Sequence, residues 1–208
     1  ATVAEMAEKA ASLGYRYIVI SDHTQSLGIA NGLNWERFQA QRQEIAEAQA
    51  RFPSLHILQG AEVEIRADGT LDLPDEFLEQ LDIVIASLHS GLRQEEAFIT
   101  DRAIRAMRNP HVDILGHPSG RLLGQREASS INLDHIIQAA AETGTILEIN
   151  SIPNRLDLDD VHIRQAIKAG VKLAINSDAH STSGLENIRY GVATARRGWA
   201  EKKDIFIT

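Results

Sequence analysis

Asp178 and His180 stand two residues apart at the end of an apolar run, residues 171–177. The aliphatic and β-branched residues of that run are typical of a buried strand. In an extended chain, side chains at positions i and i+2 point to the same side, so both groups can face one point if the strand continues through them. A carboxylate oxygen beside an imidazole nitrogen suits zinc or manganese. The pair therefore indicates one side of a candidate metal site.

Other apolar runs lead into polar groups of a similar kind. The runs 15–21, 57–65, 82–88, 112–116 and 145–149 have, at or near their ends, His23, Glu62, His89, His117 and Asn150. Chance rarely gives so many segments the same arrangement. We expect the three histidines and Glu62 to converge with Asp178 and His180 around metal ions. Asn150 is expected to line the wall of this site and to donate hydrogen bonds.

Several polar residues near these positions allow more than one interpretation. Glu64 lies on the same strand face as Glu62, so the alternation of side chains does not exclude it as a ligand. Asp22 alternates with His23, which favours a role outside the ligand set or in anchoring a loop. The remaining histidines begin strands or lie in helices and are expected to be ordinary residues: His56, His111, His135 and His162. The helical spacing of Arg102, Arg105 and Arg108 favours a solvated face.

Helical and strand-like segments alternate along the chain. Helices are predicted at residues 1–11, 34–51, 74–80, 95–108, 132–142, 159–169 and 185–197, and strands at the five runs above and at 171–177. Asn34 is a predicted N-cap, and Gly144 and Gly170 are predicted to end their helices. Continuous apolar strands between helices favour an α/β fold with a parallel sheet. An open doubly wound sheet would concentrate polar groups at one switch point, so polar groups on six strands favour a closed barrel.

Composition limits the class of protein. With 208 residues the chain is most simply one domain, and its net charge of −8 argues against a nucleic-acid-binding surface over the whole molecule. The absence of cysteine excludes disulfides and thiolate metal sites. The eight histidines are therefore the main candidates for soft metal ligands. No apolar run approaches the length of about 18 residues that a membrane span needs. We expect a cytoplasmic protein with no membrane partner.

Five short motifs together resemble one known superfamily. They are Ser21-Asp22-His23, Gly60-Ala61-Glu62, Ser87-Leu88-His89, Gly116-His117-Pro118 and Ser177-Asp178-Ala179-His180. In this order, and over essentially the whole chain, they resemble the polymerase and histidinol phosphatase (PHP) superfamily. Residues 68–75 and 116–124 are similar to the C-terminal PHP domain of bacterial family X DNA polymerases.

The resemblance implies a fold and a ligand set. The fold would be a distorted seven-stranded (β/α) TIM-like barrel holding two to three divalent ions, Mn²⁺ or Zn²⁺ with iron as a further option. Glu62 would bridge two ions and Asp178 would bind the first of them. The second ion would be held by His89 and His117, and the third by His23 and His180. The family's first motif, a His-x-His pair, would lie upstream of Ala1, so we expect residues 1–208 to be a C-terminal fragment that lacks the first strand.

Such a metal cluster predicts hydrolysis of a phosphoester. Paired divalent ions lower the pKa of a water molecule and neutralise phosphate oxygens, so neither a serine nor a cysteine nucleophile is needed. Glu62 and Asp178 would act as metal carboxylates, and His117 or His180 could protonate the leaving oxygen. Arg121 and Arg126 follow the strand that ends at His117, and we expect them to bind substrate phosphates unless they pair with acids such as Glu127.

Three hypotheses for the function are consistent with the sequence. The closer resemblance implies a manganese-dependent 3′–5′ exonuclease that processes single-stranded or 3′ DNA ends in repair, with upstream polymerase domains supplying most of the DNA affinity. The alternative enzyme is a small-molecule phosphatase of the histidinol-phosphatase type. The third reading is a structural PHP module without catalysis. Elemental analysis and assays on DNA beside histidinol phosphate separate these hypotheses.

Overall fold

Six parallel strands form a single sheet in which the strand order follows the chain. A computed structural model describes residues 1–206. The strands are β1 (Tyr17–His23), β2 (His56–Glu64), β3 (Ile83–Ser87), β4 (Ile114–Leu115), β5 (Ile146–Asn150) and β6 (Leu173–Asn176). The helices are α1 (Val3–Ser12), α2 (Trp35–Arg51), α3 (Asp75–Leu78), α4 (Glu96–Met107), α5 (Leu133–Thr143), α6 (Asp160–Lys168) and α7 (Ile188–Arg197), with short 3₁₀ turns η1 (Gly28–Ala30), η2 (Thr182–Asn187) and η3 (Lys202–Asp204).

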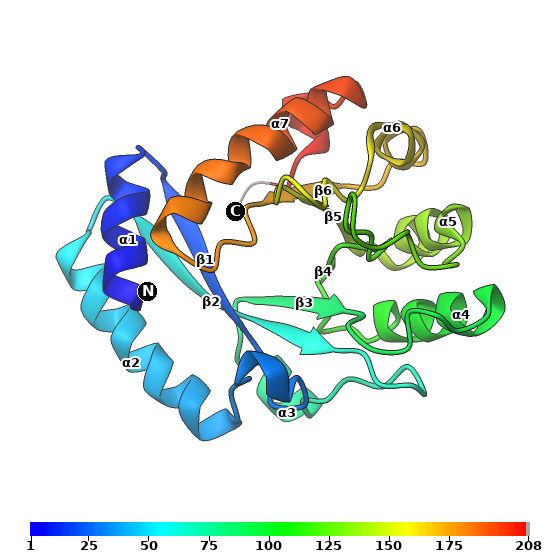
Figure 1. Ribbon diagram of the computed structural model, residues 1–208. Helices are drawn as coiled ribbons and strands as arrows, with labels where there is room; N and C mark the ends of the chain where they lie inside the picture. The colour runs from blue at the N-terminus through cyan, green and yellow to red at the C-terminus, as the bar shows by residue number, and fades with distance from the viewer. Residues whose placement is uncertain (207–208) are drawn as a thin grey trace.

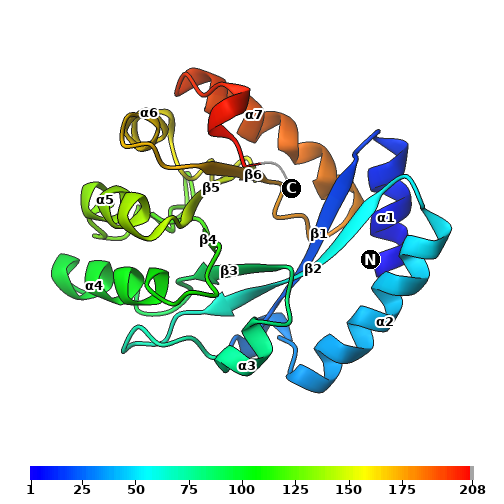
Figure 2. The ribbon, with the colours of Figure 1, turned by 180° about the vertical axis from the view of Figure 1, so that it is seen from behind.

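The sheet curls, and the helices lie around its outer face (Figures 1 and 2). Each strand pairs in parallel with the next, and β1 and β6 are the two edges. Beside β6, Ile205 forms a parallel bridge to Leu173. The predicted α/β fold with a curved parallel sheet is therefore confirmed. Within residues 1–206 the sheet is a half-barrel of six strands, so the predicted closure with seven strands is not found there.

Helix starts are fixed by local side-chain caps. Thr2 and Glu5 form a reciprocal capping box at α1, and the side chain of Asn34 accepts a hydrogen bond from the Arg37 amide at α2. Such caps satisfy amide groups that have no partner inside the helix. Gly144 ends α5 in the left-handed conformation with φ of 81°. The predicted cap at Asn34 and the stop at Gly144 are both confirmed, because they depend only on nearby residues.

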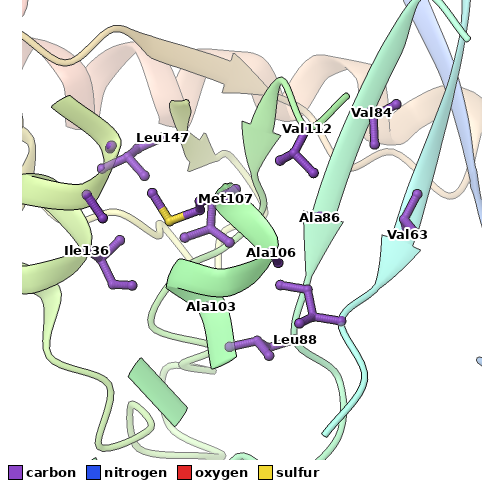
Figure 3. Close-up of a cluster of buried hydrophobic side chains, with 14 of the residues drawn as sticks. Val63, Val84, Ala86, Leu88, Ala103, Ala106, Met107, Val112, Ile136 and Leu147 are labelled. Carbon is purple, nitrogen blue, oxygen red and sulfur yellow. The ribbon is translucent and has the colours of Figure 1, made fainter. Parts of the chain in front are cut away.

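The largest apolar cluster lies between the sheet and the helices outside it. In Figure 3, Ala103, Ala106 and Met107 of α4 lie between strand residues such as Val84 and the side chain of Ile136 on α5. These three α4 residues are almost completely buried. A second cluster joins α1 and α2 to β1 and β2. Close packing on the outer face fixes the strands and hence the positions of their ends. Among the helices of residues 1–206, none is both long and apolar enough to span a bilayer.

Candidate metal centre

Glu62 lies at the centre of the polar groups that four neighbouring strands deliver. Its Oε1 is 3.1 Å from Nε2 of His89 and 2.9 Å from Nε2 of His117, and its Oε2 is 3.3 Å from Nδ1 of His23. His23 ends β1, Glu62 lies near the end of β2, and His89 and His117 follow β3 and β4. Parallel pairing places these strand ends at one edge of the sheet, as the sequence predicted.

The donor atoms fit a divalent metal ion. Nitrogen and oxygen atoms of His23, Glu62 and His89 all lie within 4.8 Å of one another. Zinc binds such donors at about 2.0–2.2 Å, so donors that already lie close together can share one ion. Imidazole and carboxylate are ligands of zinc and manganese. The ring Nδ1 atoms of His23 and His117 are buried and make no hydrogen bond to residues 1–206.

The carboxylate and imidazole groups of the centre stabilise each other's charged forms. Burial alone would raise the pKa of Glu62, but hydrogen bonds from His117 and His89 hold it well below its usual range. Burial would lower the pKa of His89, and the hydrogen bonds to Glu62 and Glu64 outweigh it and raise the pKa to about 9. Without a metal, the His89 ring therefore carries a proton at neutral pH. A metal ion that takes Nε2 of His89 must displace that proton.

His117 reaches the centre because Gly116 lets β4 approach β3. A Cβ atom on Gly116 would lie 2.3 Å from Oγ of Ser87 and 3.0 Å from Cγ2 of Ile85, so a side chain there would require these β3 side chains to move. His117 itself has φ of 25°, a conformation that L residues rarely adopt. Gly116 therefore allows a close contact with β3, and the backbone conformation of His117 directs its ring toward Glu62.

Glu64 contacts the opposite side of the His89 ring. Its Oε2 accepts a hydrogen bond from Nδ1 of His89 at 2.7 Å, and its Oε1 accepts one from the Ser90 hydroxyl at 2.8 Å. A carboxylate on Nδ1 fixes the ring orientation and leaves Nε2 directed at Glu62. Strand alternation left both glutamates open as ligands. The structure gives Glu62 the central position and Glu64 the position behind a histidine.

Arg102 supports this arrangement from α4. It is only 2% exposed, and its Nε and Nη1 donate to the carbonyls of Arg66 and Ser90, each at 2.7 Å. Its Nη2 donates to the Ile65 carbonyl and lies 3.6 Å from Oε1 of Glu64. The prediction of a solvated face was therefore wrong for Arg102. Helical spacing shows which residues share a face, but it does not show that a loop from another strand covers part of that face.

Asp178 and His180 meet the centre at its edge. Strand β6 ends at Asn176 and Asp178 has φ of 48°, so strand alternation does not bring the pair together. A turn does so instead: Nδ1 of His180 lies 3.0 Å from the carbonyl oxygen of Asp178 and 3.6 Å from its Oδ1. The His180 and His23 rings have centroids 6.2 Å apart, and the His180 side chain is 70% exposed. His180 therefore lies on the solvent side of the centre.

Two buried strand residues complete the wall. Asn150 donates to Oδ2 of Asp178 at 2.9 Å, in agreement with the predicted hydrogen-bonding role. Glu148 accepts from the His117 backbone amide at 2.6 Å and from Asn176 at 2.8 Å, and burial raises its pKa to about 7. Sequence reasoning missed Glu148. The available signal was a charged residue inside an apolar strand, on the same face as Asn150.

The two predicted phosphate-binding arginines have other partners. Arg121 donates from Nε to the Arg155 carbonyl at 2.8 Å, from Nη2 to the Leu156 carbonyl, and from Nη1 to Asp159 at 3.4 Å. Each guanidinium nitrogen of Arg121 therefore donates one hydrogen bond to the segment between β5 and α6. Arg126 binds the Gly120 carbonyl through Nε and Nη2.

The other polar residues considered from sequence lie outside the cluster around Glu62. Asp22 accepts a hydrogen bond from Gln41 of α2, so it joins β1 to a helix, and not to a loop as one interpretation of the sequence suggested. His162 pairs with Asp159 at the start of α6, with Nδ1 and Oδ1 2.7 Å apart. His56 begins β2, at the end of the strand away from Glu62.

Comparisons with known sequences find an exonuclease and a probable phosphatase among the proteins similar to this chain. The DNA polymerase/3′–5′ exonuclease PolX of Bacillus subtilis strain 168 is 46% identical over 204 residues, which cover 98% of this chain and 36% of that protein. A probable phosphatase from Thermoanaerobacter sp. strain X514 is 33% identical over 190 residues, which cover 86% of this chain and 72% of that protein. The chain thus spans about a third of the first relative and most of the second.

A comparison of structures agrees on the fold. Histidinol phosphate phosphatase from Lactococcus lactis, solved with zinc, L-histidinol and phosphate, matches with a TM-score of 0.62 at 17% identity. The match covers 92% of this chain and 86% of that one. At this identity the likeness concerns the fold, and it identifies the half-barrel as part of a known architecture. No protein-family model matches the chain.

Proposed function

The chain belongs to the polymerase and histidinol phosphatase (PHP) superfamily of metal-dependent phosphoesterases, and we propose that its substrate is DNA, from whose 3′ ends it removes nucleotides. The observation that carries the proposal is the position of Glu62, with imidazoles of three other strands within 3.3 Å of its carboxylate. That arrangement suits a cluster of divalent ions at the strand ends and contains no serine or cysteine nucleophile.

Each residue would have a defined task. Glu62 would bridge two ions, with His89 and His117 on the side of its Oε1 and His23 on the side of its Oε2. Asp178 would bind the first of these two ions, and His180, on the solvent side of the centre, would hold a third ion together with His23. Bound Mn²⁺ or Zn²⁺ would activate a water molecule and neutralise phosphate oxygens. Glu64, Asn150 and Glu148 would orient these ligands.

Two features favour DNA. The relative with 46% identity is a DNA polymerase with 3′–5′ exonuclease activity, and its match covers nearly the whole of this chain. His180 is 70% exposed, so the centre is open on that side, as a polymer substrate requires. The net charge of −8 leaves little electrostatic attraction for DNA in this domain. Polymerase domains of the same protein would supply most of the affinity, and binding should weaken steeply with salt.

A small-molecule phosphatase is the second candidate. It is supported by the 33% identity to a probable phosphatase of which the chain covers 72%. The same ions and ligands would serve a phosphomonoester, because the chemistry at phosphorus is shared. The difference between the candidates therefore lies in how the rest of the substrate is bound.

Parallel assays separate the two functions. The intact protein, loaded with Mn²⁺, is incubated with end-labelled single-stranded DNA, with DNA that has a recessed 3′ end, and with histidinol phosphate. We expect nucleotide release from both DNA substrates and none in the Glu62→Ala variant. Rapid phosphate release from histidinol phosphate, with intact DNA, would replace the first proposal with the second. Failure on all three substrates would contradict both.

A further inference from the structure

The loop between β5 and α6 brings a guanidinium to the metal centre. Nε of Arg155 lies 3.7 Å from Oδ2 of Asp178, and the Arg155 side chain is only 16% exposed. The backbone of this loop is held firmly: the Arg155 amide donates to the Ile152 carbonyl, and Arg121 binds the Arg155 and Leu156 carbonyls. Asp157 also accepts from the amides of Ser119 and Gly120. The guanidinium is therefore carried by a loop fixed at several points.

The Arg155 guanidinium lacks hydrogen-bond acceptors in its present position. Among residues 1–206 it donates no hydrogen bond, and its Nη1 is buried without a partner. The oxygen of Asp178 nearest to it already accepts from Asn150 at 2.9 Å, and 3.7 Å is beyond a hydrogen bond. A largely buried cation without hydrogen bonds is costly, and such groups are normally paired. An oxyanion that entered beside Asp178 would supply the missing acceptors.

The local charges favour an anion at this position. The guanidinium of Arg126 lies close enough that, after burial, the charge of Arg155 is the factor that lowers its pKa. The two guanidinium groups therefore lie close enough to repel each other. Asp178 is the carboxylate paired with Arg155, and a metal ion bound by Asp178 would take up that negative charge. The cationic character of the site would then increase when the metal binds.

We propose that Arg155 binds a non-bridging oxygen of the substrate phosphoryl group at the metal centre, by donating from its guanidinium. The proposal rests on the proposed phosphoesterase function and names the group that recognises phosphate in that site. It also replaces Arg121, whose donors hold the loop that carries Arg155. Guanidinium groups suit this task because their planar donors match phosphate oxygens.

Inorganic phosphate is the probe for the test. Its dissociation constant is measured by calorimetry on the intact, Mn²⁺-loaded protein for the wild type, Arg155→Met and Arg155→Lys. Methionine keeps an unbranched apolar stem without donors, and lysine keeps the charge without the planar fork. The control is Arg51→Met, because Arg51 is exposed at the end of α2, where the chain leads into the start of β2, the opposite end of that strand from Glu62. Metal content and thermal midpoint are recorded for each protein.

We expect Arg155→Met to weaken phosphate binding at least about tenfold, Arg155→Lys to weaken it less, and Arg51→Met to remain within about twofold, with equal metal content. Phosphate binding by Arg155→Met within twofold of wild type would overturn the proposal. So would loss of metal in that variant, because Arg155 would then act on Asp178. If Arg155→Met does not fold, the lysine variant decides, and wild-type phosphate affinity in it would contradict a role for the planar fork.

The same proteins separate this proposal from the proposed function. Weaker phosphate binding in Arg155→Met, together with no wild-type activity on DNA, would support Arg155 and reject the DNA substrate. Wild-type DNA hydrolysis with unchanged phosphate binding and kcat/KM in Arg155→Met would support the function and reject Arg155. A metal-loaded wild-type protein that does not bind phosphate at millimolar concentration would reject Arg155 directly.

Discussion

The carboxylate of Glu64 accepts a hydrogen bond from Nδ1 of His89 at 2.7 Å, while Nε2 of the same ring faces Glu62 at 3.1 Å. One imidazole is thus held between two carboxylates that belong to the same strand. The carboxylate behind a ligating histidine fixes which nitrogen is available to a metal. Glu64 is therefore a positioning residue in the proposed centre, although it would not touch an ion.

Replacing Glu64 by Gln should weaken metal binding by about 10–100-fold, because the ring of His89 loses its fixed orientation and part of its basicity. The measurement is competition for Mn²⁺ or Zn²⁺ with a chelator. Glu64→Asp, which keeps the charge on a shorter stem, should fall between Gln and wild type. Unchanged affinity in Glu64→Gln, with the ring still in place by NMR, would remove Glu64 from the centre.

Metal affinity should rise with pH up to about 9. The pKa of His89 is raised to about 9, so in the metal-free protein the ring stays protonated below that value and the proton competes with the ion. From this group alone, the apparent association constant should increase about tenfold per pH unit between pH 6.5 and 8.5. Calorimetry in buffers of different ionisation enthalpy measures the released protons. A constant affinity over this range would contradict the raised pKa.

Replacing Glu62 by Gln should lower hydrolysis by at least about a thousandfold, because the residue that would bridge two ions loses its charge. Elemental analysis should show fewer ions per chain. The control is His56→Gln, since His56 is exposed at the far end of β2 from Glu62. Equal loss in both variants would point to unfolding in place of a site effect, and far-ultraviolet circular dichroism distinguishes these cases.

Arg102→Met should reduce the free energy of unfolding by about 3–5 kcal/mol, which is typical for breaking a buried charge interaction. It leaves the carbonyls of Ile65, Arg66 and Ser90 without their donor. Arg105→Met, one turn further along α4, is the control: Arg105 is exposed and forms an ion pair with Asp101, so it should cost less than about 1 kcal/mol. Urea denaturation measures both. Similar losses in the two variants would contradict the special position of Arg102.

Asp159→Asn should make the protein less sensitive to acid. The hydrogen bond from His162 lowers the pKa of Asp159 to about 2 from its ordinary value of 3.8. The stabilisation from the charged carboxylate is thus complete above pH 4 and is lost as the pH falls toward 2. Asparagine still caps α6 but cannot ionise, so the difference in unfolding free energy between wild type and variant should shrink from pH 5 to pH 3. In NMR titration, the raised pKa of His162 should fall toward 6.5 in the variant. An unchanged pKa of His162 would contradict the ion pair between Asp159 and His162.

Sequence alone determined which segments are strands and which residues stand at their ends. An apolar run followed by His23, His89 or His117 is a local pattern, and parallel strands then bring those ends to one edge. Caps such as Asn34 and Gly144 are local as well. These features need no knowledge of long-range contacts, because burial of the apolar run and satisfaction of the helix amides determine them.

Only the tertiary structure decided what lies around each ligand. Glu62 and Glu64 share a strand face. The His89 ring, which follows the next strand, places Glu62 at its Nε2, in the centre, and Glu64 at its Nδ1, behind the ring. Arg102 is buried because backbone carbonyls near the end of β2 and after β3 meet it, and Arg155 reaches Asp178 because Arg121 fixes its loop. These contacts join residues 12 to 36 positions apart, and periodicity within one segment carries no information about them. The physical reason is that a side chain's partners depend on the packing of whole elements.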